Sequence, residues 1–257
     1  MSQDLTRLRR SLREFTPARV SLARAGDSIA TSEVLSLQLA HAQARDAVHQ
    51  QVHWPAFAAR LAAELPLQEL PVLALRSQAT DRAMYLRNPG RGRTLHPDSA
   101  ALLEAGEYDL AIVIADGLSA LAIERHAIPV LAYLLPGLRS RQWRLAPLTL
   151  VQHGRVAIAD PIGAGLGARC SLVLIGERPG LTSPDSMGAY LTWGPVVGRT
   201  DADRNCLSNI RASGLAPEAA AARLLNLLDL ARAMGRTGTF LKEGAHAGRL
   251  ESGPRQG

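Results

Sequence analysis

DLAIVIADGLSALAIERHA, residues 109–127, is the stretch that decides the fold class. Residues 109–116 form a short, continuous apolar run rich in Ile and Val, which is typical of a buried strand. The run ends at Asp116 and Gly117, and residues 119–127 continue with a helical pattern. A buried strand followed by a turn and a helix is the repeating unit of α/β folds, so this stretch predicts an α/β protein.

Further apolar runs supply strand candidates at residues 128–135, 147–151 and 171–176. RVAIADPIGAGLGAR, residues 155–169, lies between two of them and is predicted to be a crossover helix weakened by its glycines. Pro161 interrupts this stretch, so the helix is expected to start near that residue. Strands that alternate with helices predict a parallel, Rossmann-like sheet with right-handed connections.

The N-terminal part has a different pattern. Residues 32–53 and 55–65 have the apolar spacing of helices, while residues 71–75 could form either a short strand or a loop. The turn-rich sequence NPGRGR, residues 88–93, then precedes the change to alternating strands and helices.

The chain is therefore predicted to have two parts, a mainly helical region at residues 1–95 and a Rossmann-like α/β domain at residues 96–257. In the second part, residues 217–234 have Ala, Leu and Arg at helical spacing and predict a last helix. The sequence after residue 244 is expected to be a frayed tail.

Composition limits the class of protein. With 47% apolar residues the chain can bury a core, and its 4% aromatic content disfavours a surface on which nucleotides stack. Its two cysteines, Cys170 and Cys206, provide neither a disulfide framework nor a tetrahedral zinc site. The first residues form no secretory signal, and no stretch approaches the roughly 20 apolar residues of a membrane span. A cytoplasmic protein is expected.

The formal charge of +6 and the pI near 10.1 leave three kinds of partner open: nucleic acid, a membrane surface or an acidic protein. Lys242 is the only lysine, so arginine carries the positive charge. Arginine suits desolvated, bidentate contacts with carboxylates and phosphates. The basic loop GRGR at residues 90–93 favours nucleic acid only weakly, because such loops are usually solvated turns.

Three loops are candidates for ligand binding, because ligands of parallel sheets lie outside the carboxyl ends of the strands. These loops are at residues 114–120, 175–186 and 194–211. Each combines glycines, which permit close approach of the backbone, with polar groups that can orient a ligand.

Other motifs are weaker. GAGLGA at residues 163–168 matches the dinucleotide fingerprint G-x-G-x-x-A, but that fingerprint needs a strand before it and a helix after it, and here the order is reversed. His49 and His53 have the spacing of two zinc ligands without the general-base Glu of a metalloprotease. No nucleophile elbow or Ser, His and Asp arrangement is evident, so no catalytic residue is predicted on this chain.

Several motifs together resemble one family. GERPGL at residues 176–181, SPDSMGAYLT at 183–192 and DRNCLSNIR at 203–211 are similar to motifs of the small subunit, or light chain, of ethanolamine ammonia-lyase. The further stretches that agree are FTPARVSLARAG at 15–26, AHAQARDAVH at 40–49 and YDLAIVIADGLSA at 108–120. The resemblance extends from about residue 15 to residue 242.

The resemblance implies a lyase that uses adenosylcobalamin to convert ethanolamine into acetaldehyde and ammonia by radical chemistry. It implies that a large subunit holds the substrate, while the small subunit forms one wall of the cobalamin site and contacts the large subunit through its N-terminal region. It further implies heterodimers that assemble into a dodecamer of six large and six small subunits, with no nucleic acid or membrane partner. In some members the enzyme lies inside a bacterial microcompartment in the cytoplasm.

By this resemblance the cobalamin-binding residues are Val156, Glu177 and Cys206. Glu177 would accept hydrogen bonds from amide groups at the rim of the cofactor, and Val156 would supply apolar contact. Cys206 would pack on the cofactor or present its backbone. From the residues alone another interpretation stays open, in which Cys206 is core and Glu177 pairs with Arg178 or Arg204. The chain has no Asp-x-His-x-x-Gly loop, so the cofactor is expected to keep its own base as the lower ligand of cobalt.

Overall fold

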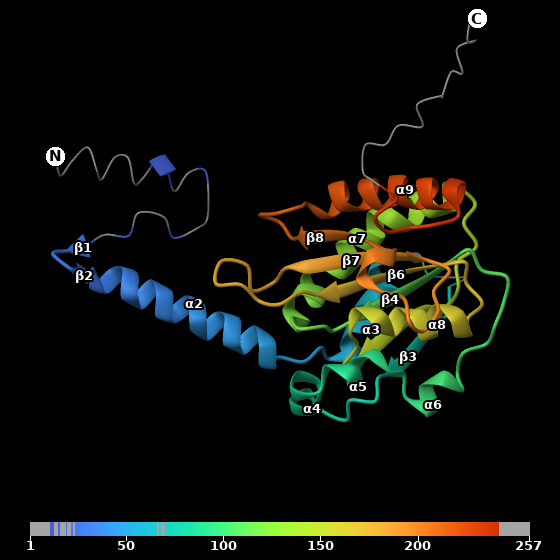
Figure 1. Ribbon diagram of the computed structural model, residues 1–257, viewed down its shortest axis with the longest axis horizontal. Coiled ribbons are helices and arrows are strands. Elements are labelled where there is room, and N and C mark those ends of the chain that lie inside the picture. The colour runs from blue at the N-terminus through green and yellow to red at the C-terminus, as the bar shows by residue number, and fades with distance from the viewer. Residues whose placement is uncertain are drawn as a thin grey trace, which may run out of the picture.

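A six-stranded sheet forms the centre of the molecule (Figure 1). The computed structural model describes residues 24–65, 67 and 70–241, together with 11, 12, 15, 19 and 22. The expected tail after residue 244 and much of the motif at residues 15–26 lie outside the described residues. Helices lie on both faces of the sheet, which confirms the predicted α/β class.

The sheet is mixed, with the strand order β3-β5-β4-β6-β7-β8. Its strands are β3 (Val72–Arg76), β4 (Leu110–Ala115), β5 (Leu148–Gln152), β6 (Cys170–Gly176), β7 (Met187–Trp193) and β8 (Arg204–Ile210). The first four are parallel, whereas β7 is antiparallel to both β6 and β8. The expectation of a parallel sheet was therefore wrong for β7. The connection from β6 to β7 is too short for a crossover helix, and a parallel neighbour needs a crossover of about a dozen residues or more.

Alternation along β4 divides the core into two layers. Leu110, Ile112 and Ile114 belong to the layer under α3 (Trp54–Glu64), α7 (Ala120–Ser140) and α9 (Pro217–Met234). Ala111 and Val113 belong to the layer under the 3-10 turn η1 (Val156–Ile158) and α8 (Ala159–Gly165). The crossover predicted at residues 155–169 is confirmed, although α8 starts before Pro161.

The strand predicted at residues 128–135 was wrong, because this segment lies inside α7. Ile128, Leu131, Leu134 and Leu135 are all buried there. A helix that is apolar around most of its circumference has no visible period, so its sequence resembles a buried strand.

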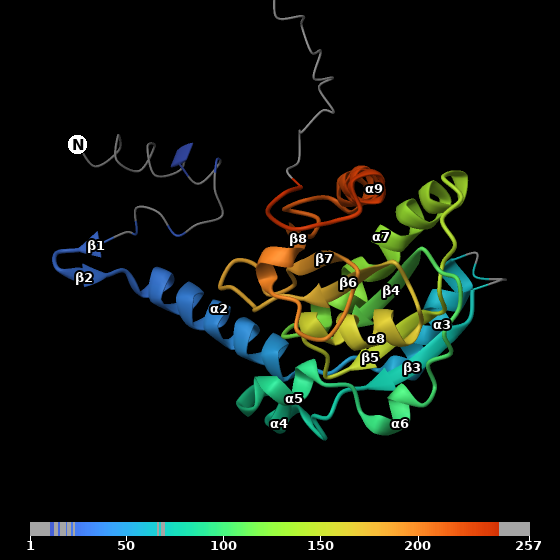
Figure 2. The ribbon, with the colours of Figure 1, turned by 45° about the vertical axis from the view of Figure 1, so that its right-hand side comes forward.

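The N-terminal part contains the long helix α2 (Thr31–His49), which ends earlier than expected, and the short helices α4 (Arg82–Arg87), α5 (Pro89–Arg93) and α6 (Pro97–Ala100). Before α2 lie two short paired strands, β1 (Arg24–Ala25) and β2 (Ser28–Ile29). α2 extends away from the body in both ribbon views (Figures 1 and 2). In contrast, α3 packs into the main core through Phe57 and Leu61, and β3 joins the sheet.

Candidate functional site

The carboxyl ends of β4, β5 and β6 meet at one edge of the sheet, where α2 also approaches the body. β8 is antiparallel to β7, so its carboxyl end at Ile210 lies at the same edge. The predicted loops at residues 114–120 and 175–186 therefore lie at this edge. The third predicted loop was wrong in part, because residues 204–210 form β8 and residues 194–203 lie at the opposite edge.

Glu177 immediately follows β6, and three donors hold its carboxylate. The Ser208 hydroxyl donates to Oε1 at 2.5 Å, and the Ser186 hydroxyl donates to Oε2 at 2.5 Å. The backbone N–H of Asn209 also donates to Oε2, at 3.1 Å. Hydrogen bonds to a carboxylate are stronger than those between neutral groups, so the side chain is fixed in place.

A β-bulge in β8 brings two of these donors to Glu177. Met187 pairs with Ile210 and Ala189 with Leu207, so two residues of β8 lie opposite the single Gly188 of β7. One of the two, Asn209, has a φ of 59°, in the left-handed region. Bulges of this kind change the direction of a side chain, here that of Ser208.

Gly188 leaves room for the carboxylate. A Cβ at this position would lie 3.0 Å from Glu177 Oε1 and 3.0 Å from the Tyr190 ring, closer than nearly all real contacts. Glycine therefore allows Glu177 to lie across the sheet beside Tyr190, on the face that α8 covers over β4 and β6.

Cys206 lies on the outermost strand, directly opposite Tyr190 of β7. Although Cys206 is exposed as a residue, neighbouring atoms desolvate its thiol, and this effect, with the negative charges of Glu177 and Asp201, raises the pKa of the thiol, which stays protonated. The structure therefore brings Cys206 and Glu177 together around Tyr190.

The alternative interpretation of these two residues was wrong. Cys206 is exposed and not part of the core. Arg204 pairs with Asp160 at 2.6 Å, and within the described chain no arginine lies at ion-pair distance from Glu177. The carboxylate is satisfied by hydroxyl and backbone donors instead.

Val156, the third predicted residue, begins η1 after β5 and is partly buried against the α8-side core, which Tyr190 also borders. The turn before it is tied to β4, because the buried carboxylate of Asp116 accepts the backbone N–H groups of His153 at 3.0 Å and Gly154 at 3.1 Å. Val156 thus lies on the same face of the sheet as Glu177 and Cys206. Val156 and Tyr190 pack against the same core layer.

The sequence did not reveal the residues that stabilise this edge from the N-terminal part. Arg82 is buried and donates to the carbonyl groups of Gly117 and Leu118, at 2.7 and 3.1 Å. The Tyr85 hydroxyl donates to the carbonyl of Gly154 at 3.2 Å. Both come from α4, a short helix in a region that had no strong periodic pattern.

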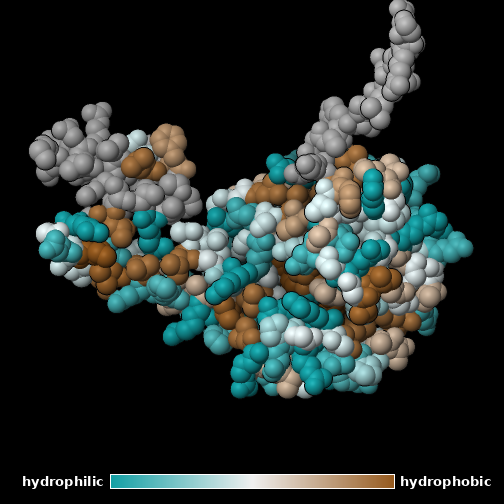
Figure 3. All heavy atoms as spheres, in the orientation of Figure 1, coloured by the Kyte–Doolittle hydropathy of each residue, from teal (hydrophilic) through white to brown (hydrophobic). Residues whose placement is uncertain are grey.

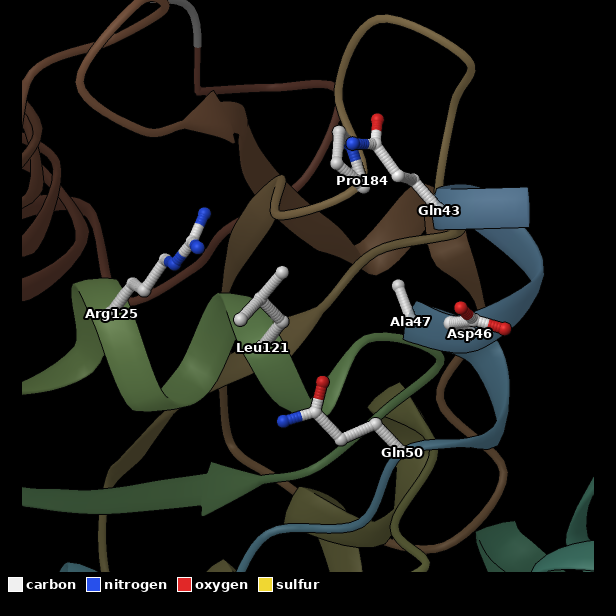
Figure 4. Close-up of a pocket in the computed structure, with 7 residues that line it drawn as sticks. All are labelled: Gln43, Asp46, Ala47, Gln50, Leu121, Arg125 and Pro184. Carbon is white, nitrogen blue, oxygen red and sulfur yellow. The ribbon is translucent and has the colours of Figure 1, made fainter. Parts of the chain in front are cut away.

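A hollow of about 290 Å³ separates the C-terminal half of α2 from α7 and the loop at residues 177–186 (Figure 4). It is lined by Gln43, Asp46, Ala47, Gln50, Leu121, Arg125 and Pro184. The Leu121 side chain lies between Arg125 and the residues of α2 (Figure 4). α2 therefore borders the same edge as the candidate site.

The competing motifs do not form sites in the structure. The glycines of GAGLGA lie against other segments: a Cβ on Gly163 would approach Pro195 to 2.6 Å, and one on Gly165 would approach Leu103 to 2.6 Å. These glycines serve close packing. Among the residues described, no three His, Cys, Asp or Glu side chains gather where they could hold a metal ion. Within the same part of the chain, the helices lack the combined length and apolar character of a membrane span.

Comparison with known proteins gives a consistent result over nearly the whole chain. Residues 7–242 match the family model for the ethanolamine ammonia-lyase light chain. A relative from Azotobacter vinelandii is 51% identical over 95% of this chain and 92% of its own, and one from Ralstonia nicotianae is 50% identical over the same shares. A relative from Pseudomonas fluorescens is 48% identical over 94% of this chain and 89% of its own. All three are named ethanolamine ammonia-lyase small subunit.

Proposed function

The chain belongs to the ethanolamine ammonia-lyase light-chain family, from which we infer that it forms one wall of a cobalamin site in a two-subunit lyase. Membership of a small-subunit family implies a large-subunit partner. In this proposal the large subunit holds ethanolamine, and the enzyme releases acetaldehyde and ammonia. Adenosylcobalamin, when bound, supplies the radical chemistry.

The donors and acceptors around Glu177 fit the rim of cobalamin. That rim carries primary amides, whose N–H groups need acceptors, and a carboxylate oxygen can accept two hydrogen bonds. Among the described residues, Oε1 accepts a hydrogen bond from Ser208 alone, which leaves it a free lone pair. The space above Gly188 keeps the carboxylate beside Tyr190 and Cys206, where an extended ligand can contact all three.

The chain's own residues bind, orient and exclude water. Glu177 is fixed by three donors before any ligand arrives, so binding costs little further ordering of this side chain. Val156 would supply apolar contact from η1, and the protonated Cys206 thiol would pack against the ligand. We assign no proton or electron transfer to these groups. In this proposal the catalytic residues belong to the large subunit.

We propose that α2 is the main contact of residues 1–95 with the large subunit, while residues 96–257 bind the cofactor. Apolar side chains gather along α2 where it projects from the body (Figure 3). Leu35 is 59% exposed and Leu39 is 60% exposed, and only Ala40 and Ala47 of this helix are buried. A helix of this length gains most of its stability from packing, so this face needs a partner.

The remaining features of the assembly follow from the family. We propose heterodimers that form a dodecamer of six large and six small subunits, in the cytoplasm or in a bacterial microcompartment within it. The native mass of the purified complex measures the stoichiometry.

The observation that carries the function is the partly exposed carboxylate of Glu177, which three donors fix in place. Co-expression with a large subunit should give one complex on gel filtration that retains the visible spectrum of added cobalamin, whereas the chain alone should have no lyase activity.

Glu177→Ala should weaken cobalamin binding by on the order of 1.5 to 3 kcal/mol, as expected for a charged hydrogen bond. Separate elution of the subunits without retained colour would contradict the proposal, and unchanged affinity in the variant would remove Glu177 from the site.

A further inference from the structure

The bulge in β8 places a second acceptor beside Glu177. Ser208 is exposed, and its hydroxyl oxygen lies 2.5 Å from Glu177 Oε1. The conformation that produces this pair includes the left-handed backbone of Asn209, which asparagine adopts more readily than most residues other than glycine.

Counting lone pairs shows which atoms remain free. Oε2 of Glu177 accepts from Ser186 and from the backbone of Asn209, so both of its lone pairs are used. Within the part of the chain that the structure describes, Oε1 accepts only from Ser208 and has one lone pair left. The Ser208 hydroxyl uses its single hydrogen in that bond, so its oxygen can only accept from any further partner. Two adjacent oxygens, Oε1 and Ser208 Oγ, can therefore each accept one more hydrogen bond.

Two acceptors this close together can share one N–H donor in a three-centre hydrogen bond. The N–H of a primary amide is such a donor, whereas a carboxylate would bring negative charge against Glu177. We propose that Ser208 and Glu177 together bind one primary amide of the corrinoid rim, with Ser208 orienting Oε1 and sharing the N–H that Oε1 accepts. This inference rests on the proposed function and adds Ser208 to the cofactor-binding residues.

The test uses the complex co-expressed with the large subunit and follows binding by visible absorbance. The probes are cyanocobalamin and cobalamin monocarboxylic acids, in which one rim amide is hydrolysed to an acid. The unmodified complex should prefer cyanocobalamin over at least one of these acids by roughly tenfold or more, as for loss of a charge-assisted hydrogen bond. Ser208→Ala should weaken cyanocobalamin binding several-fold and reduce the preference for the amide.

Two further variants separate ligand contact from support of the fold. Ser208→Thr keeps the hydroxyl and should retain both the affinity and the preference. Ser186→Ala removes the matched hydroxyl that holds Oε2, so it should weaken the affinity by loosening Glu177, but it removes no acceptor beside Oε1 and should keep the preference for the amide. Melting temperatures of all variants identify any loss of folding.

The outcomes distinguish this inference from the function on which it rests. If Glu177→Ala loses affinity while Ser208→Ala does not, Glu177 acts alone and the inference is wrong, but the cobalamin site stands. Equal losses in Ser208→Ala and Ser186→Ala, with the amide preference unchanged, would make Ser208 a support only and also overturn it. If neither Glu177→Ala nor Ser208→Ala changes binding, this inference and the assignment of Glu177 to the site both fail, while the co-expression experiment decides the proposed function separately.

Discussion

Arg204 and Asp160 form a buried ion pair that joins the outermost strand to α8. Their side chains are each 2% exposed, and the guanidinium donates to both carboxylate oxygens, at 2.8 and 2.6 Å. Arg204 also donates to the Thr192 hydroxyl at 2.7 Å. Because Cys206 lies two residues further along β8, this pair fixes the part of the strand that carries the candidate site.

Asp160→Asn should destabilise the protein by roughly 3 to 5 kcal/mol, because it leaves the Arg204 charge buried without a counter-charge. Thermal or urea unfolding of the co-expressed complex measures this loss. The control is Asp160→Asn combined with Arg204→Met, which removes the unpaired charge and should recover much of the stability. An unchanged melting temperature in the single variant would show that the pair is not essential to the fold.

At the scale of elements, the loop at residues 177–186 is attached to α7 by Asp185. Its carboxylate accepts from Arg125 at 2.9 Å and lies 3.3 Å from Nε2 of His126. Burial lowers the pKa of His126, and this effect outweighs the neighbouring carboxylate. For Asp185, burial acts to raise the pKa, but hydrogen bonds from Arg125 and His126 lower it overall.

Both shifts make the folded state less stable in acid. The pKa of His126 is lower in the folded chain than its ordinary value of 6.5, so the unfolded chain binds more protons in that range. The contribution of His126 is present above pH 6.5 and is lost as the pH falls below it. That of Asp185 is lost at lower pH, as its carboxylate protonates.

We therefore predict that the melting temperature of the complex falls between pH 7.5 and 5.5, a window flanking the ordinary His pKa of about 6.5. His126→Gln, which cannot titrate, should flatten part of that slope. A variant with the same pH dependence as the unmodified protein would assign the slope to other groups.

α2 buries little of its apolar surface against the rest of the described chain, so its exposed leucines need another partner. Leu35→Gln combined with Leu39→Gln should weaken association with the large subunit by roughly tenfold or more, because burying a leucine contributes about 1.5 to 3 kcal/mol. The melting temperature of the isolated chain should hardly change, since both side chains are exposed. Leu102→Gln is the matched control, because Leu102 is 53% exposed but lies on the body. Equal association of all variants, measured by titration of the large subunit, would contradict the role of α2.

At the scale of the whole molecule, the sequence predicted the α/β class and the elements with strong patterns. The buried strand at β4 and the helix at residues 217–234 were confirmed. The direction of β7 was missed because apolar spacing within a strand does not show the orientation of its neighbour. β8 was taken for a loop because its bulge breaks the alternation, so that Leu207 and Ile210, which enter the same core layer, are three residues apart.

The candidate site could be predicted only as single residues. Glu177 and Cys206 came from the family resemblance, and the structure brings them together around Tyr190. Ser208 was within a quoted motif but had no assigned role, because its contact with Glu177 spans 31 positions of sequence and depends on the bulge. Distant contacts of this kind arise from strand register, which local sequence patterns do not encode.

The bulge also bears on how the free subunit behaves. β8 is at the border of the sheet, and such a strand exposes unpaired backbone groups that can template the addition of strands from other molecules. At Ser208 and Asn209 that ladder is interrupted, because the Asn209 N–H is directed to the Glu177 carboxylate. β8 therefore does not present a long, regular edge for self-association while the subunit is still free of its partner.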